Sequence, residues 1–174
     1  MTAITALKSA PNVVDPNEVL PVVHPSEGGC QTTVDRLVKY VAGNVVSDLQ
    51  SVMPLWTATT TEPILADGKL QAHVSTVGKT RTAMIYLRLG ASTVKGEGAW
   101  IFRLPEGLDD KAAVDAIGIA RALHGTTMTI GVAEIVADSC ELKVASSMGH
   151  WGPALPTQWG EGDTLSLSIT YRIV

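Results

Sequence analysis

The last eleven residues of the chain constrain its fold more than any other stretch. In TLSLSITYRIV every second side chain is apolar, and the residues between them are polar or charged. The apolar positions are Leu165, Leu167, Ile169, Tyr171 and Ile173. A period of two is that of a β-strand with one face in a core and the other toward solvent. The segment therefore predicts a half-buried antiparallel strand.

Segments of similar character recur upstream. Strands are predicted in KLQAHVSTV, RTAMIYLRL, AWIFRL, TMTIGVAEIV and CELKVAS. These segments contain β-branched residues and are bounded by Gly, Asp or Ser. In AWIFRL, Trp100 and Phe102 share one face, which we assign to the core. The stretch LDDKAAVDAIGIARAL is ambiguous, because its alanines favour a helix while Ile117, Ile119 and Arg121 alternate. We expect a loop followed by a strand there.

Six to eight short strands separated by turn signals predict a mainly β domain over residues 54–174. Its expected form is an antiparallel β-sandwich or jelly roll. Residues 1–31 read instead as an extended, irregular arm, since Pro11, Pro16, Pro21 and Pro25 interrupt any regular element. The chain is thus predicted to consist of an arm with one short helix, residues 1–53, and the β-domain.

The short helix is predicted over residues 32–53. Thr32 can cap its start with Asp35 as the capping-box partner, and Pro54 ends it. One apolar stripe runs along it, formed by Val34, Val38, Val41, Val45, Leu49 and Val52. The stripe has two interpretations, a helix packed on its own domain or a helix that bundles with copies of itself. Gly43 and Asn44 weaken the middle and argue against a long coiled coil.

The triplet Gly78-Lys79-Thr80 resembles the end of a phosphate-binding loop. That loop needs an earlier glycine five residues before Gly78, where His73 stands, and a helix after the threonine. The following RTAMIYLRL is a predicted strand, so no helix N-terminus would meet a phosphate. We therefore interpret Gly78 as a hairpin glycine.

Composition narrows the remaining function classes. The net charge is -4 and the cations are scattered, which argues against nucleic acid as a partner. No stretch is apolar long enough to insert into a bilayer. Cys30 and Cys140 are interpreted as reduced structural thiols, and the four histidines are dispersed, so neither a metal nor another cofactor is expected.

Catalytic arrangements are also not found in the sequence. Asp109 and Asp110 are neighbours on a predicted loop, where solvated carboxylates are the simpler interpretation. The simpler interpretation of Asp163 is that it shapes the turn before the last strand. No nucleophile, base and orienting residue come together, so the chain is not expected to be an enzyme. A glycan-degrading enzyme, which needs paired carboxylates, ranks third among the functions considered.

The segment from Pro54 to Pro105 resembles one that recurs in minor tail and tail-fibre proteins of tailed bacteriophages. The stretch DPNEVLPVVHPSEGGCQTTVDRLVKYV likewise resembles the anchoring start of phage fibres and spikes. The resemblance covers most of residues 15–174, with a poor match over 106–155. Its matching positions are Trp56-Thr57, Thr60-Thr61, Gly68-Lys69-Leu70, Val77-Gly78-Lys79-Thr80, Gly96 to Pro105, Trp159, Gly162-Asp163, Leu165 and Tyr171.

The resemblance implies a virion structural protein, assembled in the host cytoplasm, that forms a homotrimer. Residues 1–53 would bind capsid or tail proteins and the β-domain would face outward. At 174 residues the chain would make a very short fibre, so a capsid decoration or head-fibre protein is an open alternative. A second alternative is a host-adsorption module that binds a surface glycan.

The loop SSMGHWGPALPTQWGEGD holds the candidate glycan contacts, Trp151, His150 and Gln158. A tryptophan ring can stack on a sugar, and the imidazole and amide can hydrogen-bond to its hydroxyls. The competing interpretation is that Trp151 and Trp159 cover one end of the β-domain or a subunit interface.

Overall fold

The computed structural model describes residues 19–24, 28–33 and 49–174, and the chain divides into two compact units, Met1–Ser47 and Asp48–Val174. In the first unit, β1 (Val19–His24) pairs with β2 (Gly28–Thr33) in antiparallel register. The irregular arm predicted for residues 1–31 lies largely outside the described residues, and this hairpin is the described part of that region. A two-stranded ladder consists of edge strands only, and an edge strand tolerates a proline such as Pro21.

The predicted helix of residues 32–53 falls largely outside the described residues. Its stripe positions Val34, Val38, Val41 and Val45 lie there. At the two ends of the predicted range the chain is strand, with Thr32 in β2 and Val52 in β3 (Gln50–Val52). Val52 pairs with Ala72 in the sheet of the second unit, so the predicted range ends in a strand.

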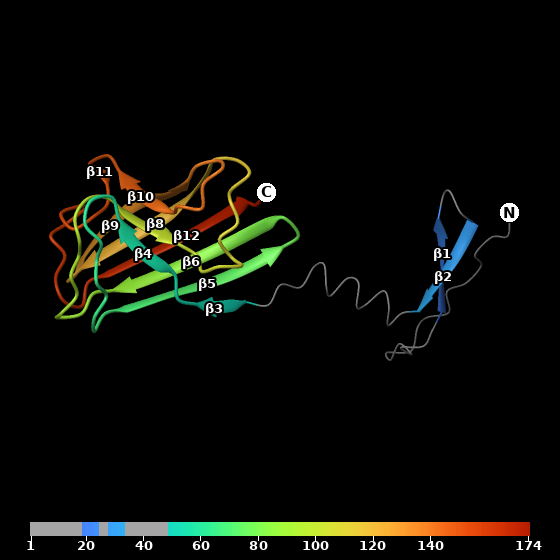
Figure 1. Ribbon diagram of the computed structural model, residues 1–174, viewed down its shortest axis with the longest axis horizontal. Coiled ribbons are helices and arrows are strands. Elements are labelled where there is room, and N and C mark those ends of the chain that lie inside the picture. Colours follow the sequence, from blue (N-terminus) through green and yellow to red (C-terminus); the bar gives the residue numbers. More distant parts are fainter. Residues whose placement is uncertain (1–18, 25–27, 34–48) are drawn as a thin grey trace. The chain divides into compact units, whose positions relative to one another are not determined.

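One antiparallel sheet of eight strands dominates the second unit (Figure 1). Its order is β11-β10-β9-β8-β12-β6-β5-β3, so the last long strand, β12, lies in the middle between two local hairpins. The bounds not yet given are β5 Lys69–Val77, β6 Thr80–Arg88, β8 Ala116–His124, β9 Thr127–Ile135, β10 Lys143–Ser146, β11 Gly149–His150 and β12 Thr164–Arg172.

A second sheet of two strands, β4 (Leu55–Ala58) and β7 (Trp100–Arg103), joins the core of this unit. Trp56 stands opposite Phe102 in their antiparallel register. An isolated bridge between Phe102 and Leu142 links β7 to the chain just before β10. The small sheet packs on the inner face of the large one, and buried residues of both sheets form one core cluster.

The alternation of burial along the long strands defines two faces of the large sheet. On β12, Leu165, Leu167, Ile169 and Tyr171 are buried, as their spacing predicted. The intervening residues point to the other side. We call that side, formed by the alternate residues of β5, β6, β12, β8 and β9 that do not enter the core, the outer face.

The prediction of a mainly β, antiparallel fold is confirmed, and the expected loop followed by a strand is present at β8. The two sheets are not matched, however. Eight strands lie in one sheet that curves like half a barrel and two lie in the other. Within the described ranges, no helix is long and apolar enough to cross a membrane.

Gly78 is the hairpin glycine that the sequence predicted. Val77 pairs with Thr80 across a turn formed by Gly78 and Lys79, and Gly78 has a φ of 57°. A positive φ is a conformation that glycine adopts without steric cost. The residues after Thr80 continue as strand β6, so the triplet is a turn and not the start of a helix.

Candidate functional site

Trp151, the leading candidate for a glycan contact, lies in the core. Its side chain is only 1% exposed. Its backbone is held on both sides, with its N–H donating to Val144 O at 2.7 Å and its carbonyl accepting from Trp100 N at 2.9 Å. A sugar cannot stack on a ring that is already covered, so this candidate contact is not available in the folded domain.

Trp151 belongs to a continuous cluster that contains all four tryptophans and the one phenylalanine of the chain. The rings follow one another in space in the order Phe102, Trp56, Trp100, Trp159 and Trp151, and neighbouring ring centroids are 5.1 to 6.5 Å apart. Such spacing is that of aromatic rings in contact. The tryptophans of the loop therefore close one end of the core, which is the competing interpretation of the sequence.

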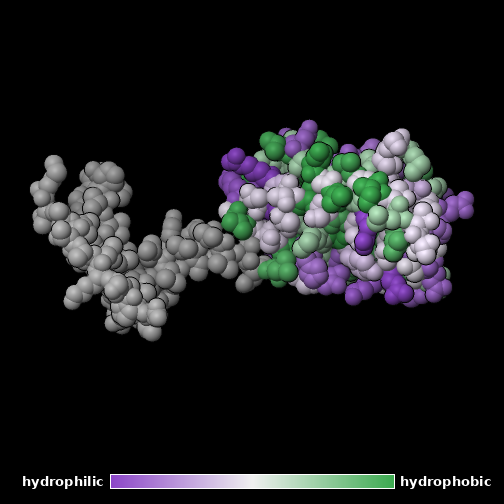
Figure 2. Space-filling view, turned by 180° about the vertical axis from the view of Figure 1, so that it is seen from behind, coloured by the Kyte–Doolittle hydropathy of each residue, from purple (hydrophilic) through white to green (hydrophobic). Residues whose placement is uncertain are grey.

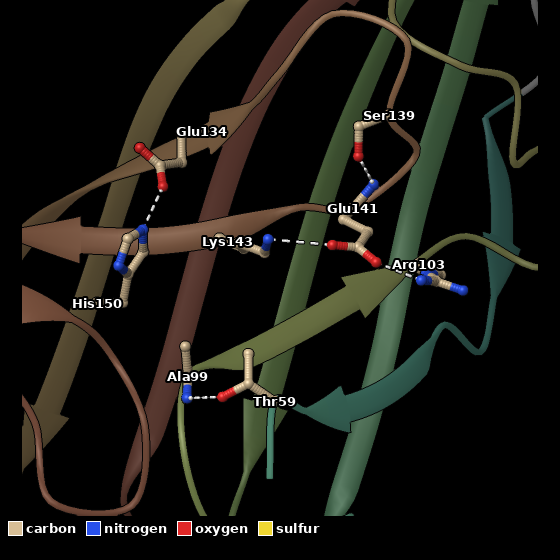
Figure 3. Close-up of polar contacts among 8 residues, drawn as sticks. All are labelled: Thr59, Ala99, Arg103, Glu134, Ser139, Glu141, Lys143 and His150. Atoms are coloured by element: carbon tan, nitrogen blue, oxygen red, sulfur yellow. Dashed lines mark hydrogen bonds and ion pairs between the residues drawn. The ribbon is translucent and has the colours of Figure 1, made fainter.

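His150 and Gln158 are exposed, unlike Trp151. The His150 Nε2 lies 2.7 Å from Glu134 Oε1, a contact that ties β11 to β9 (Figure 3). A shallow hollow lies beside this histidine, lined by Gly98, His150, Gly152, Pro153, Ala154 and Leu155. The structure thus separates the predicted contacts into one buried and two exposed residues.

Other polar side chains near this end serve the fold. Glu141 forms ion pairs with Arg103 and with Lys143, the latter at 3.0 Å, and Ser139 Oγ accepts from its backbone N–H (Figure 3). The hydrogen bond from Arg103 is the main cause that holds the pKa of Glu141 below its usual value. These contacts join β7 to β10. They do not form a reactive pair of carboxylates.

The neighbouring carboxylates Asp109 and Asp110 are not paired with each other for acid–base chemistry. Asp110 Oδ2 accepts a hydrogen bond from Arg81 Nη2 at 2.8 Å, and Arg81 is a buried cation only 3% exposed. Arg81 also donates to Thr76 Oγ1 and to the carbonyl of Leu108. Asp110 therefore balances a buried charge and fixes the loop before β8. Among the described residues, no group of three or more potential ligands is placed to hold a metal.

Asp163 holds the turn before β12 from a buried position, with 5% of the residue exposed. Its Oδ2 accepts from Gly160 N and contacts His124 Nδ1, both at 2.6 Å. Burial alone would raise the pKa of Asp163, but the hydrogen bonds from Gly160 and His124 outweigh it and lower that pKa. A lowered carboxylate pKa stabilises the fold at neutral pH and ceases to do so as the pH falls through the folded-state value.

We expect Asp163→Ala to lower the free energy of unfolding by about 1–3 kcal/mol at pH 7, because the Gly160 amide and the His124 ring lose a charged acceptor. The difference from the natural chain should shrink below about pH 4, since the ordinary pKa is 3.8 and the folded value is lower. Urea melts across pH 3 to 7 test this. Asp109→Ala, at an exposed loop position, is the control. A difference that grows toward acid pH would contradict the expectation.

The outer face of the large sheet carries several exposed apolar side chains. Its apolar side chains are large and exposed, namely Met84, Ile117, Ile119, Met128, Ile130 and Val132, at 42% to 77%. Figure 2 shows hydrophobic residues in several groups among polar ones on the side turned away from the viewer in Figure 1. Groups of large exposed apolar residues on one face are typical of interaction sites on soluble proteins.

Strand register arranges these side chains in two rows that cross five strands. One row is Val132, Ile119, Ser168, Met84 and His73, and the next is Ile130, Arg121, Ser166, Tyr86 and Gln71. The short serines of β12 stand between larger side chains on both sides. The result is a groove of about 400 Å³ over the centre of the sheet, with walls of aliphatic and aromatic carbon.

Sequence reasoning missed this surface, although a signal was present. On β8 and β9 the core positions hold small residues such as Ala120, Gly131 and Ala133, while the outer positions hold the bulky ones. A Cβ on Gly131 would lie 2.5 Å from Trp151 Cζ2, so the small inner residues leave room for the loop tryptophan. A strand in which small residues at the core positions alternate with large aliphatic residues is thus the pattern that identifies an apolar outer face.

Comparison with known proteins gives one informative similarity. The chain is 35% identical over 115 residues, 63% of its length, to the "Mu-like prophage FluMu defective tail fiber protein" of Haemophilus influenzae. It spans only 18% of the length of that curated relative. No protein-family model and no solved structure matches the chain. The similarity supports the expectation that the chain is a phage protein of the tail-fibre type.

Proposed function

We propose that this chain is a structural component of a phage particle that forms a short trimeric fibre. The observation that carries the proposal is its similarity to a prophage tail fiber protein. In the proposal, residues 1–53 attach the fibre to capsid or tail proteins, and the β-domain extends outward. A role as a capsid decoration is the variant of this function that differs only in the attachment point.

The outer face supports self-association as part of this function. Six exposed Met, Ile and Val side chains lie on adjacent strands together with an apolar groove. Removing apolar surface from water is favourable by about 25 cal/mol per Å², before the entropic costs of association are counted, so covering this face would favour an oligomer. Residues within the core of an interface are characteristically apolar in this way.

The separate roles of the N-terminal segment in attachment and of the β-domain in folding are tested with a shortened chain. This chain begins at Asp48, the start of the second compact unit. Starting instead at Leu55 would remove β3, which pairs with β5 in the large sheet. We expect the shortened chain to keep a cooperative thermal transition, because the core of the second unit is built from residues after Asp48. Particles that lack this protein should incorporate the full chain and not the shortened one. Incorporation of the shortened chain would reject the attachment role of residues 1–47.

Glycan binding remains a second candidate function because His150 is exposed beside a hollow in the loop. If this hollow binds a sugar, His150→Ala should reduce adsorption to host cells, with Gln158→Ala as the companion variant on the same loop. Binding of fluorescently labelled protein to cells or extracted glycan measures the effect. Unchanged binding by both variants would leave only the structural role.

A further inference from the structure

The outer face has a charge that differs from the rest of the chain. On the five long strands it carries Lys69, Arg88, Arg121 and Arg172 but only one carboxylate, Glu134. The whole chain has a net charge of -4, so its carboxylates lie mostly elsewhere. Arg121 stands at the groove, next to Ile130 and opposite Ser166. The surface that covers this face should therefore be apolar and acidic.

A second exposed patch of the same unit has that character. Ile64 and Val94 are 60% and 51% exposed and face each other in an isolated antiparallel bridge. Glu62 and Glu97, both exposed, flank them. We call these four residues the acidic ridge. Lys95, which lies between Val94 and Glu97 in the chain, directs its Nζ to the carbonyl of Trp159.

The backbone holds the acidic ridge in place. Ile64 and Val94 exchange two N–H···O bonds of 2.8 and 2.9 Å. Glu97 N donates to Thr61 O at 3.0 Å, and the amides of Thr60 and Thr61 donate back to Glu97 O. A Cβ on Gly96 would lie 2.2 Å from Thr61 O, so the two segments are in close contact. A patch held in this way loses little conformational entropy when it binds.

We propose that copies of this chain associate head to tail, with the acidic ridge of one copy seated on the outer face of the next. Ile64 and Val94 would cover the apolar groove, and Glu62 and Glu97 would meet Arg121 and Arg88. This inference rests on the self-association in the proposed function and specifies its interface. A head-to-tail contact closes into a ring when its rotation permits, and a rotation of about 120° per copy would give the cyclic trimer of the proposed function.

The charges argue against the alternative in which two outer faces meet around a two-fold axis. In that arrangement each face would present its four cations to the same four cations of the partner, with one carboxylate on each side. Like charges brought together at an interface cost binding energy, whereas opposite patches steer association and fix register. The head-to-tail contact pairs the basic surface with an acidic one and still covers the aliphatic side chains.

Chemical cross-linking between copies tests the interface in the full chain. In a background with Cys30 and Cys140 changed to serine, Ile119→Cys labels the outer face and Val94→Cys labels the acidic ridge. Both positions are exposed, so neither change should unfold the protein. A short bis-maleimide should link copies of the double variant into species of up to three chains, seen by denaturing electrophoresis. Each single variant should stay mostly uncross-linked.

Every outcome of this experiment decides the proposal. Efficient dimers from Ile119→Cys alone would show a face-to-face contact and overturn it. An assembled chain that gives no cross-links in the double variant would also overturn it, and would point to another occupant of the groove. A chain that sediments as a monomer would reject the proposed self-association itself, and the interface with it.

A charge exchange gives an independent readout. Arg121→Glu should weaken assembly about tenfold or more, because it places a carboxylate opposite the acidic ridge. Adding Glu62→Arg and Glu97→Arg to that variant should restore at least part of the loss. The midpoint of dissociation on dilution, followed by sedimentation, measures both effects. If Arg121→Glu is neutral, or if the reversal on the ridge deepens the defect, the pairing is wrong.

Discussion

Phe102→Ala is expected to lower the free energy of unfolding by about 3–5 kcal/mol. Phe102 is fully buried, at 0% exposure, and its ring stacks parallel to Trp56 with centroids 6.4 Å apart. Its backbone exchanges hydrogen bonds with Leu142, which joins the small sheet to the large one. Loss of the ring would leave a cavity at this junction, so both the transfer term and the cavity term oppose folding.

Urea denaturation of the full chain measures this change, with unfolding followed by tryptophan fluorescence. Val136→Ala is the control, because Val136 is 60% exposed and its truncation should change stability by less than about 0.5 kcal/mol. A cost for Phe102→Ala that is near zero would mean that the face of β7 is exposed. In that case Trp100 and Phe102 would become candidates for a binding surface.

Trp151→Ala is expected to cost a similar amount, about 3–5 kcal/mol. The ring is 1% exposed and packs over Gly131 in β9 and against Trp159. Its Nε1 has no hydrogen-bond partner among the described protein atoms, so truncation removes packing and breaks no side-chain hydrogen bond. The loss should therefore appear as reduced stability, without a specific loss of ligand binding.

Measuring both the melting temperature and the cell binding of Trp151→Ala separates a packing role from a recognition role. His150→Ala, on the neighbouring exposed residue, is the matched control and should change stability by less than about 1 kcal/mol. Loss of cell binding in Trp151→Ala with an unchanged melting temperature would restore the ring as a ligand contact. A large drop in melting temperature assigns it to the core.

The strands were predictable because burial on one side of a sheet imposes a period of two. The predicted segments for β5 and β12 begin at the observed residues, and the turn at Gly78 followed from its neighbours. Pairing partners were not predictable in this way. β12 inserts between β6 and β8, and alternation along one strand does not identify the strands beside it.

The role of Trp151 was the part of the site that sequence could not determine. Glycines and prolines around it indicated a loop, and loops are usually exposed. Only the fold brings that loop over Gly131, where the absence of a side chain creates space for an indole ring. The outer face was not predicted either, because bulky residues such as Ile119 and Ile130 would ordinarily be assigned to a core.

The most direct test of the account is the mass of the intact chain in solution. Sedimentation equilibrium at micromolar concentration should give three times the 18.3 kDa mass of one chain. That result would agree with a fibre component whose outer face is covered by a neighbouring copy. A mass of one chain at this concentration would contradict the proposed trimer and leave the apolar outer face without its expected partner.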